Sequence, residues 1–316
     1  MNCLCCGKPL KDPGVSGWHS SCIRKFFGTS SFPEIEISRE MLELLAAQSV
    51  NKGITVTGVQ KKLSLHLFSD RKKTRLTLVD HPTGYILKPQ VEEYPCMPES
   101  EHLVMTMADA CGIATVPHAL IQKDGEYAYI TKRLDRIQEN GQTVKLAMED
   151  FCQLDQRLTQ DKYKGSYERC AKVIDRYSSR SKLDNTELFI RIVFCFITGN
   201  SDMHLKNFSL IETFAGSGSY VLSPAYDLLP VNLLLPEDAE ETALTLNGKK
   251  ANIRRGDFLK LAAACGIPEA TASRLITSIT SRQNALLSLS EASYLPKDMK
   301  SVFSVMIDER CRRLEG

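Results

Sequence analysis

The stretch GNSDMHLKNFSL, residues 199–210, places an acid, a histidine, a lysine and an asparagine directly after the apolar run LFIRIVFCFI. Phosphoryl transfer needs a carboxylate near the attacking hydroxyl and oxygen ligands that hold Mg²⁺ against the phosphates. In one known solution, an aspartate that acts as base and an asparagine five positions later that binds the metal share a loop. Asp202 and Asn207 have this spacing. The spacing alone is equally typical of a polar loop that follows a helix.

A second metal-binding carboxylate is expected after a hairpin that follows this loop. Residues 208–224, FSLIETFAGSGSYVLSP, predict that hairpin through their alternating flanks and their Gly-Ser-Gly-Ser turn. Asp227 in SPAYDLL then supplies the carboxylate. Lys206 is placed to neutralise a phosphate oxygen, and His204 is placed to orient the loop. The alternative is an unrelated Tyr-Asp turn, but the combination favours metal-dependent phosphoryl transfer.

This chemistry also requires a strand lysine that holds the nucleotide phosphates. Lys88 ends the apolar strand predicted at GYILKPQ, residues 84–90. An unpaired ammonium is costly there, so we expect an ion pair with Glu101, which begins the predicted helix SEHLVMTMADACGI. Glu99 is the alternative partner. The competing interpretation is a strand-end lysine that extends to solvent.

A loop that covers the phosphates is expected upstream of this lysine. The segment GITVTGVQKKLSLHL, residues 53–67, has the character of a turn between two strands, although it lacks the G-x-G-x-x-G pattern. Its hydroxyl and amide groups are suited to donate hydrogen bonds to phosphate oxygens. The candidate nucleotide-binding positions are Thr55, Val56, Thr57, Gly58 and Gln60.

The chain has 316 residues, of which 43% are hydrophobic and 25% charged, with a formal charge of +2. These values are typical of a globular protein and give no general basic field for nucleic acid. No run approaches the roughly 20 apolar residues of a membrane span, and the N-terminus does not resemble a signal peptide. The eleven cysteines lie mostly in apolar segments, which favours reduced thiols and a cytoplasmic protein.

The elements fall into three predicted domains. Residues 1–28 form a short, zinc-knuckle-like element, and residues 29–134 form a strand-rich lobe with a helix at 38–50 and another at 100–113. Residues 135–316 form a larger lobe that is mainly helical from Glu149. This order predicts an α+β, bilobal, kinase-like fold.

The N-terminal element has the ligand types and paired spacing of a structural zinc site: Cys3, Cys6, His19 and Cys22. Each pair is able to hold the ion from a tight turn, and bound metal would offset the entropy of ordering a segment too short for its own core. Cys5 is a spare thiol that is able to replace Cys3. The alternative is a set of ordinary reduced cysteines beside a histidine.

Several motifs together resemble those of HipA-like serine/threonine kinases, the toxins of bacterial toxin–antitoxin modules. TVTGVQKKLSL, YILKPQ, PESEHLVMTMADACGI, YITKRLDR, MEDFCQL, GNSDMHLKNFSLI, LSPAYDLLP and LTLNGKK occur in the family's order, from about residue 53 to 250. The resemblance implies ATP and Mg²⁺ as cofactors and a nucleotide between the lobes. It makes Asp202 the base, Asn207 and Asp227 the Mg²⁺ ligands, and Lys88 the phosphate lysine, while the backbone of Lys132 and Leu134 meets adenine.

The resemblance further implies a protein substrate such as an aminoacyl-tRNA synthetase, and autophosphorylation of the covering loop, for which Thr55 and Thr57 are the candidates. Expected partners are a helix-turn-helix antitoxin, with DNA reached only through it, and a small separate protein that replaces the N-terminal subdomain of longer relatives. The alternatives are a small-molecule or lipid kinase of related fold, and a catalytically silent pseudokinase or zinc adaptor.

Overall fold

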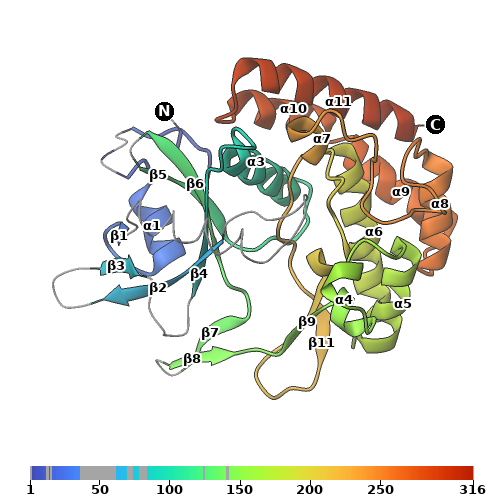
Figure 1. Ribbon diagram of the computed structural model, residues 1–316, viewed down its shortest axis with the longest axis horizontal. Helices are drawn as coiled ribbons and strands as arrows, with labels where there is room; N and C mark the ends of the chain where they lie inside the picture. The colour runs from blue at the N-terminus through green and yellow to red at the C-terminus, as the bar shows by residue number, and fades with distance from the viewer. Residues whose placement is uncertain are drawn as a thin grey trace. The chain divides into compact units, whose positions relative to one another are not determined.

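The computed structural model describes residues 2–11, 14, 16–35, 62–69, 74–77, 84–123, 125–139 and 142–315. The predicted helix at 38–50 and the candidate phosphate-covering positions Thr55, Val56, Thr57, Gly58 and Gln60 lie outside these residues. The chain divides into two compact units (Figure 1). The first unit comprises residues 1–102 and 116–143, and the second comprises residues 103–115 and 144–316.

The first unit is built on a six-stranded sheet with the order β1-β3-β2-β4-β6-β5. Its strands are β1 (Glu34–Ile35), β2 (Leu63–Ser69), β3 (Thr74–Thr77), β4 (Tyr85–Pro89), β5 (His118–Lys123) and β6 (Glu126–Lys132). All neighbours are antiparallel except β1 and β3. The aromatic and β-branched residues of YILKP and EYAYITK suit these central positions. The strand predicted at residues 84–90 is confirmed as β4.

The short helix α1 (Ser20–Phe27) contributes two phenylalanines to an aromatic cluster in the first unit. It ends at Gly28, whose φ of 75° gives the left-handed C-cap that glycine adopts at low cost. Edge-to-face and tilted ring contacts then join Trp18, Phe26, Phe27, Phe32 and, on β4, Tyr85. This cluster gives the N-terminal segment a small apolar core that the sheet completes.

The second unit is mainly helical, as predicted. Its helices are α4 (Phe151–Leu154), α5 (Tyr167–Tyr177), α6 (Ser181–Ile197), α7 (Val231–Leu234), α8 (Arg255–Ala264), α9 (Glu269–Thr280), α10 (Gln283–Ala292) and α11 (Lys297–Glu315). The helix α3 (Met97–Ala110) begins in the first unit and contributes its last residues to the second. Two single 3₁₀ turns, η1 (Thr159–Asp161) and η2 (Leu205–Asn207), complete the helical elements.

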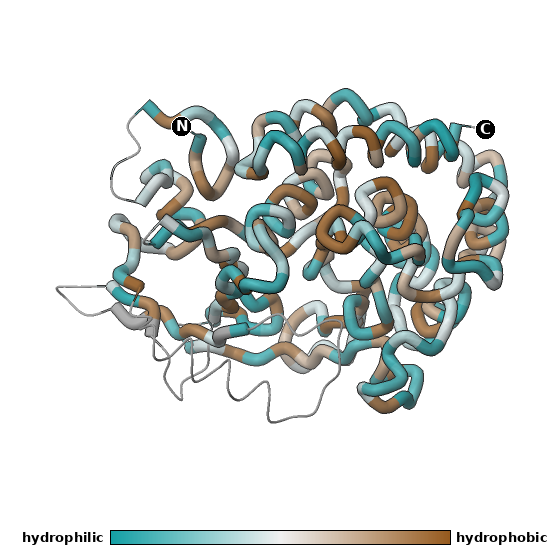
Figure 2. Tube along the Cα trace, turned by 45° about the horizontal axis from the view of Figure 1, so that its top comes forward, coloured by the Kyte–Doolittle hydropathy of each residue, from teal (hydrophilic) through white to brown (hydrophobic). Residues whose placement is uncertain are grey.

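Helix α6 is the buried centre of this unit, and its segment from Ile192 to Ile197 is inaccessible to solvent along its whole length. Helix α11 contacts α6 and is amphipathic, with Phe303, Ile307, Cys311 and Leu314 buried at helical spacing. Figure 2 shows the resulting alternation of hydrophobic and hydrophilic segments along the helix that ends at the C-terminus. Among the described residues, every helix is too short or too polar to cross a membrane.

The predicted hairpin is confirmed as β10 (Ser209–Glu212) paired with β11 (Tyr220–Leu222). The sequence did not predict its third strand, β9 (Met148–Asp150), which pairs with β10 on the other side. The expectation of helix from Glu149 onward is wrong by two residues, because the helix starts only after Asp150 caps α4. Two further short strands, β7 (Arg136–Glu139) and β8 (Gln142–Lys145), form a separate pair.

Candidate active site

The polar stretch that carries Asp202 begins with a tight turn at the end of α6. Gly199 has a φ of 73°, and the amides of Gly199 and Asn200 donate to the carbonyls of Phe196 and Cys195. This pair of hydrogen bonds is the Schellman motif, which terminates a helix at a left-handed residue. A side chain at Gly199 would also meet the Met306 sulfur of α11 at 2.6 Å. Glycine is therefore favoured here by the left-handed conformation, and any side chain would also displace the end of the Met306 side chain.

Asp202 and Asn207 lie in one internally hydrogen-bonded loop. The amide of His204 and the side-chain nitrogen of Asn207 both donate to the Asp202 carbonyl, at 2.8 Å and 2.9 Å. The hydroxyl of Tyr163 donates to Oδ1 of Asp202 at 2.6 Å. The buried ring of His204 packs edge-on against Tyr163, with centroids 5.0 Å apart. The loop thus fixes the direction of the Asp202 carboxylate.

The side chain of Asn207 has a defined orientation. Because its nitrogen donates to a carbonyl, the amide oxygen Oδ1 faces the other way and is the atom suited to a hard cation. Asn207 is buried, with 7% of its surface exposed, so few alternative orientations are open to it. An amide oxygen and a carboxylate, as on Asn207 and Asp227, are the kinds of ligand that Mg²⁺ prefers, so the two residues remain the predicted Mg²⁺ ligands.

The segment that carries Asp227 is bonded directly to this loop. The hydroxyl of Tyr226 donates to the Lys206 carbonyl at 3.1 Å and is 2.6 Å from Oγ of Ser209. Asp227 itself has a φ of 55°, a left-handed conformation that aspartate tolerates better than most residues. Such a backbone persists only where its surroundings fix it, and the Tyr226 bonds provide that constraint.

The Lys206 side chain forms an ion pair next to the loop. Its Nζ is 2.5 Å from Oδ2 of Asp150, whose Oδ1 accepts the Gln153 amide in the capping box of α4. Asp150 therefore joins the start of α4 to the loop between Asp202 and Asn207. If Lys206 contacts a phosphate oxygen as predicted, its ammonium would have to bind that oxygen and the Asp150 carboxylate at the same time.

A buried arginine supports the segment before Asp227. Arg191 of α6 is 1% exposed, and its Nη2 donates to the Ser223 carbonyl at 2.9 Å. Burial lowers the pKa of its guanidinium below the ordinary value. A buried charge is costly, and here it holds the chain just ahead of the segment that carries Asp227.

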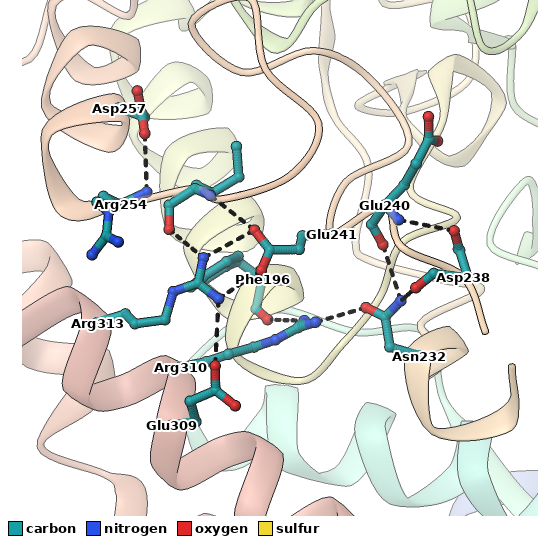
Figure 3. Close-up of polar contacts among 11 residues, drawn as sticks. Phe196, Asn232, Asp238, Glu240, Glu241, Arg254, Asp257, Glu309, Arg310 and Arg313 are labelled. Atoms are coloured by element: carbon teal, nitrogen blue, oxygen red, sulfur yellow. Dashed lines mark hydrogen bonds and ion pairs between the residues drawn. The ribbon is translucent and has the colours of Figure 1, made fainter. Parts of the chain in front are cut away.

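A second buried arginine fixes the base of the loop from α11 (Figure 3). Arg310 donates to the Phe196 carbonyl at 2.6 Å and to Oδ1 of Asn232 at 2.8 Å. The amide of Asn232 donates to the Gly199 carbonyl at 3.0 Å, and its side chain approaches Oγ of Ser201 at 3.4 Å. Arg310 and Asn232 therefore connect α11, the end of α6 and the segment after Asp227.

In the first unit, Lys88 pairs with Glu101 rather than with the alternative Glu99. The Lys88 Nζ lies 2.5 Å from Oε1 of Glu101, and the two residues are 1% and 0% exposed. The ammonium also lies 5.2 Å from the centroid of the Tyr129 ring. Glu99 is buried separately, and burial raises the pKa of its carboxyl. A lysine–glutamate pair of this kind is a required part of a kinase nucleotide site.

The predicted adenine contacts at Lys132 and Leu134 receive limited support. The amide of Lys132 already donates to the Pro117 carbonyl, and the next amide, that of Arg133, donates to Gly84. The Lys132 ammonium lies over the rings of Phe26 and Tyr85, and burial lowers its pKa. The Lys132 amide is therefore already engaged within the first unit, and the adenine contact of Leu134 stays a prediction.

The four predicted zinc ligands of the first unit lie together. One atom from each of Cys3, Cys6, His19 and Cys22 lies within 4.8 Å of all the others. The Nδ1 of His19 is 3.4 Å from the Cys6 sulfur and 3.8 Å from that of Cys22. A tetrahedral zinc with zinc–sulfur bonds of about 2.3 Å holds its sulfur ligands about 3.8 Å apart. The alternative ligand Cys5 is not part of this set.

The surroundings of the set suit a metal. The Nε2 of His19 lies 3.1 Å from the Pro9 carbonyl, which only accepts, so the proton is on Nε2 and Nδ1 is free to bind metal. Burial raises the pKa of the Cys3 thiol, but backbone donors at Cys6 and His19 outweigh it and lower the pKa overall. Gly7, with a φ of 68°, closes the first ligand turn.

Comparison with known proteins places these features in a family. The HipA-like C-terminal domain matches residues 54–286, which is most of the chain. The chain belongs to the HipA-like family. A Haemophilus influenzae protein named "Putative kinase" is 29% identical over 279 residues, covering 80% of this chain and 78% of that protein. The HipA-like family therefore includes curated relatives named as kinases.

Two Sinorhizobium fredii proteins with the same kind of name are also similar to this HipA-like chain. One is 32% identical over 231 residues and the other 28% over 219 residues, each covering 68% of this chain. The matches cover 54% and 50% of those proteins, so the chain spans about half the length of these two relatives.

Solved structures of the HipA-like fold agree with the predicted class. HipA of Shewanella oneidensis, solved with HipB and operator DNA, matches with a TM-score of 0.71 and 20% identity, over 89% of this chain and 71% of that one. The Helicobacter pylori proinflammatory kinase CtkA matches with a TM-score of 0.54 and 15% identity, over 80% and 94%. At these identities the likeness shows fold alone, and it confirms the predicted α+β, kinase-like fold.

Sequence reasoning missed the residues that hold the candidate site of this HipA-like chain in place. Tyr163, Asp150, Tyr226, Arg191 and Arg310 each bond to the loop or to a segment beside it. Tyr226 alone gave a signal, because it precedes Asp227 in a recognised motif. The others lie 32 to 114 residues from their partners, a separation at which spacing carries no information.

We expect Gly199→Ala to reduce the free energy of unfolding more than Gly216→Ala does. Both glycines have a positive φ, at 73° and 74°, but only Gly199 faces a neighbour, the Met306 sulfur. The left-handed backbone costs either variant about 1–2 kcal/mol, and displacing the flexible end of Met306 adds about 1 kcal/mol at Gly199 alone. Urea unfolding followed by circular dichroism measures both losses, and equal losses would contradict the steric argument.

Arg310→Met is expected to loosen the loop that carries Asp202. The variant leaves the Phe196 carbonyl and the Asn232 side chain without their charged donor, at a cost of about 2–3 kcal/mol. Amide hydrogen exchange, read by mass spectrometry, should become faster between residues 199 and 207. The exposed neighbour Arg312→Met is the control and should change nothing. Unchanged exchange in the Arg310 variant would show that the loop does not depend on this contact.

Proposed function

We propose that this HipA-like chain is an ATP- and Mg²⁺-dependent serine/threonine protein kinase. The observation that carries the proposal is the bonded pair of segments in the second unit. Asp202 and Asn207 share one hydrogen-bonded loop, and the segment that carries Asp227 bonds to that loop through Tyr226. The buried Lys88–Glu101 pair of the first unit supports the same assignment.

Asp202 is assigned as the general base. The Tyr163 hydroxyl holds Oδ1, and Oδ2 is assigned to the acceptor hydroxyl, since a carboxylate has about four lone-pair sites. The acceptor oxygen forms a bond to the γ-phosphorus while the bond to the β–γ bridging oxygen breaks. The acceptor proton passes to Asp202, and ADP leaves with the bridging oxygen.

Asn207 Oδ1 and the Asp227 carboxylate would hold Mg²⁺, which when bound balances the negative charge of the phosphates. Lys88 is assigned to the nucleotide phosphates, with Glu101 fixing its ammonium. Lys206 and His204 are assigned to loop geometry, because their contacts run to Asp150 and Tyr163. Leu134 is assigned to adenine.

The acceptor is proposed to be a cytoplasmic protein, with Thr55 and Thr57 as autophosphorylation candidates. The Shewanella oneidensis HipA was solved with HipB and operator DNA; by analogy, we propose a DNA-binding antitoxin as partner here. An aminoacyl-tRNA synthetase is the substrate class that the family suggests. A small-molecule acceptor is the competing proposal, and transfer assays with host protein extract against sugar, choline or lipid acceptors distinguish the two.

Asp202→Asn and Asp227→Asn are each expected to reduce phosphoryl transfer by at least about 10³-fold, because one removes the base and the other a metal ligand. Incorporation of ³²P from labelled ATP into host proteins is the measurement. The exposed Asp298→Asn in α11 is the control and should retain full activity. Wild-type incorporation by either site variant refutes its role, and nucleotide binding without transfer by the wild type would favour a pseudokinase.

We also propose that Cys3, Cys6, His19 and Cys22 bind a structural zinc ion. Elemental analysis of purified protein should find about one zinc ion per chain. Cys6→Ser is expected to lower that content to background, because three ligands hold zinc far more weakly than four. Cys5→Ser changes a neighbouring thiol outside the set and should leave the content unchanged. Equal zinc loss in both variants would rule out this ligand assignment.

A further inference from the structure

The N-terminal knuckle, residues 2–11 and 16–22, is hydrogen-bonded to the edge strand of the first unit. Strand β5 is the last in the sheet order. The amide of Leu120 donates to the Leu4 carbonyl at 2.8 Å, and the Leu120 carbonyl accepts from the Trp18 indole at 3.0 Å. Leu4 lies between the ligands Cys3 and Cys6, and Trp18 immediately precedes His19. Both bonds thus come from residues that the ligand turns position.

Leu120 lies in the same cross-strand row as the phosphate lysine. It is opposite Tyr129 on β6, and Tyr129 is opposite Lys88 on β4. The Lys88 ammonium also lies over the Tyr129 ring. A displacement of β5 at Leu120 is therefore passed directly to Tyr129 and then to Lys88, because packed strands transmit strain.

The knuckle also contacts the residue next to Glu101. The Cys5 backbone lies beside His102, a buried residue of α3, close enough to influence the pKa of its ring. The His102 ring contacts His118 at 5.5 Å, and His118 stacks on Tyr129 at 6.2 Å. Burial, more than the nearby His118, lowers the pKa of His102 to about 3, so its ring is neutral and packs as an aromatic group.

A third contact comes from the helix that carries the second ligand pair. Cys22 lies in the first turn of α1, and Phe26 and Phe27 at its end pack on Tyr85 of β4. The Tyr85 hydroxyl donates to the Phe26 carbonyl at 3.3 Å. Tyr85 begins the strand that carries Lys88.

We infer that metal bound at the four-ligand knuckle sets the position of the Lys88–Glu101 pair, so that nucleotide binding depends on metal occupancy. The inference rests on the proposed zinc site and on the proposed phosphate role of Lys88. The knuckle is too short to order itself without its metal. Metal loss would free Leu4, Cys5 and Trp18 and leave the backbone groups of Leu120 exposed to water.

Two measurements test this independently of catalysis. Trp18 is the only tryptophan in the chain and is buried, so its emission reports the knuckle contact. Lys88 is 1% exposed and should resist an amine-specific acylating reagent, whereas Lys145 on the surface serves as the internal reference. The two proteins compared are Cys22→Ser, which removes a ligand, and Cys5→Ser, which removes the neighbouring thiol.

We expect Cys22→Ser to lose zinc, to shift Trp18 emission to longer wavelength and to label Lys88 several-fold faster than wild type. Its dissociation constant for Mg-ATP, measured by calorimetry, should rise about tenfold, the effect of losing roughly one charge-assisted bond to phosphate. Cys5→Ser should match wild type in all four measurements.

Trp18→Phe is a third variant, because it removes the indole donor to Leu120 and keeps an aromatic ring and all four metal ligands. It should keep its zinc and still label Lys88 faster. Zinc loss in Cys22→Ser without a change in Lys88 labelling would overturn the inference while leaving the zinc site and the kinase intact. A wild-type protein that binds zinc and protects Lys88 but transfers no phosphate would instead refute the kinase proposal, and the labelling comparison would still support the coupling.

Discussion

The hydroxyl of Tyr226 makes the contact on which the candidate site of the second unit depends. Its bonds to the Lys206 carbonyl and to Ser209 join two segments that are separated by a hairpin. One segment carries Asp202 and Asn207, and the other carries Asp227 in a left-handed backbone conformation. Local preference would not maintain that conformation. The hairpin of β10 and β11 sets the distance between the segments, and the Tyr226 hydrogen bonds fix how the segments lie against each other.

The site is anchored by buried polar groups rather than by apolar packing alone. Arg191 and Arg310 are both nearly inaccessible, and both donate to main-chain carbonyls at the boundaries of the site. A buried guanidinium contributes little net stability but is strongly directional. These arginines therefore specify where the loop starts and where the segment that leads to Asp227 passes. Most of the stability of the unit comes from the apolar surface of α6 and the helices around it.

The sequence was informative where the chemistry is local. The spacing of Asp202 and Asn207, the strand that ends in Lys88 and the two cysteine pairs each lie within a few residues, so type and spacing predicted them. The sequence favoured Glu101 over Glu99 and Cys3 over Cys5, and the structure brings these first choices together. The sequence kept the alternatives open, because adjacent residues of the same chemical type differ only in the direction of their side chains. Strand β9 was not predicted, because its three residues are too few to show the alternation of polar and apolar side chains that marks a strand. Tyr163 and Arg310 act across long separations and left no pattern to read.

The position of the knuckle on the sheet has one more physical consequence. A terminal strand presents unpaired amide and carbonyl groups, and such a row is a template for another chain to extend the sheet. At Leu120 the first unit occupies both groups with its own N-terminal segment. An ion bound by this segment would therefore also protect against intermolecular strand pairing, and a chain deprived of it would become prone to self-association along β5.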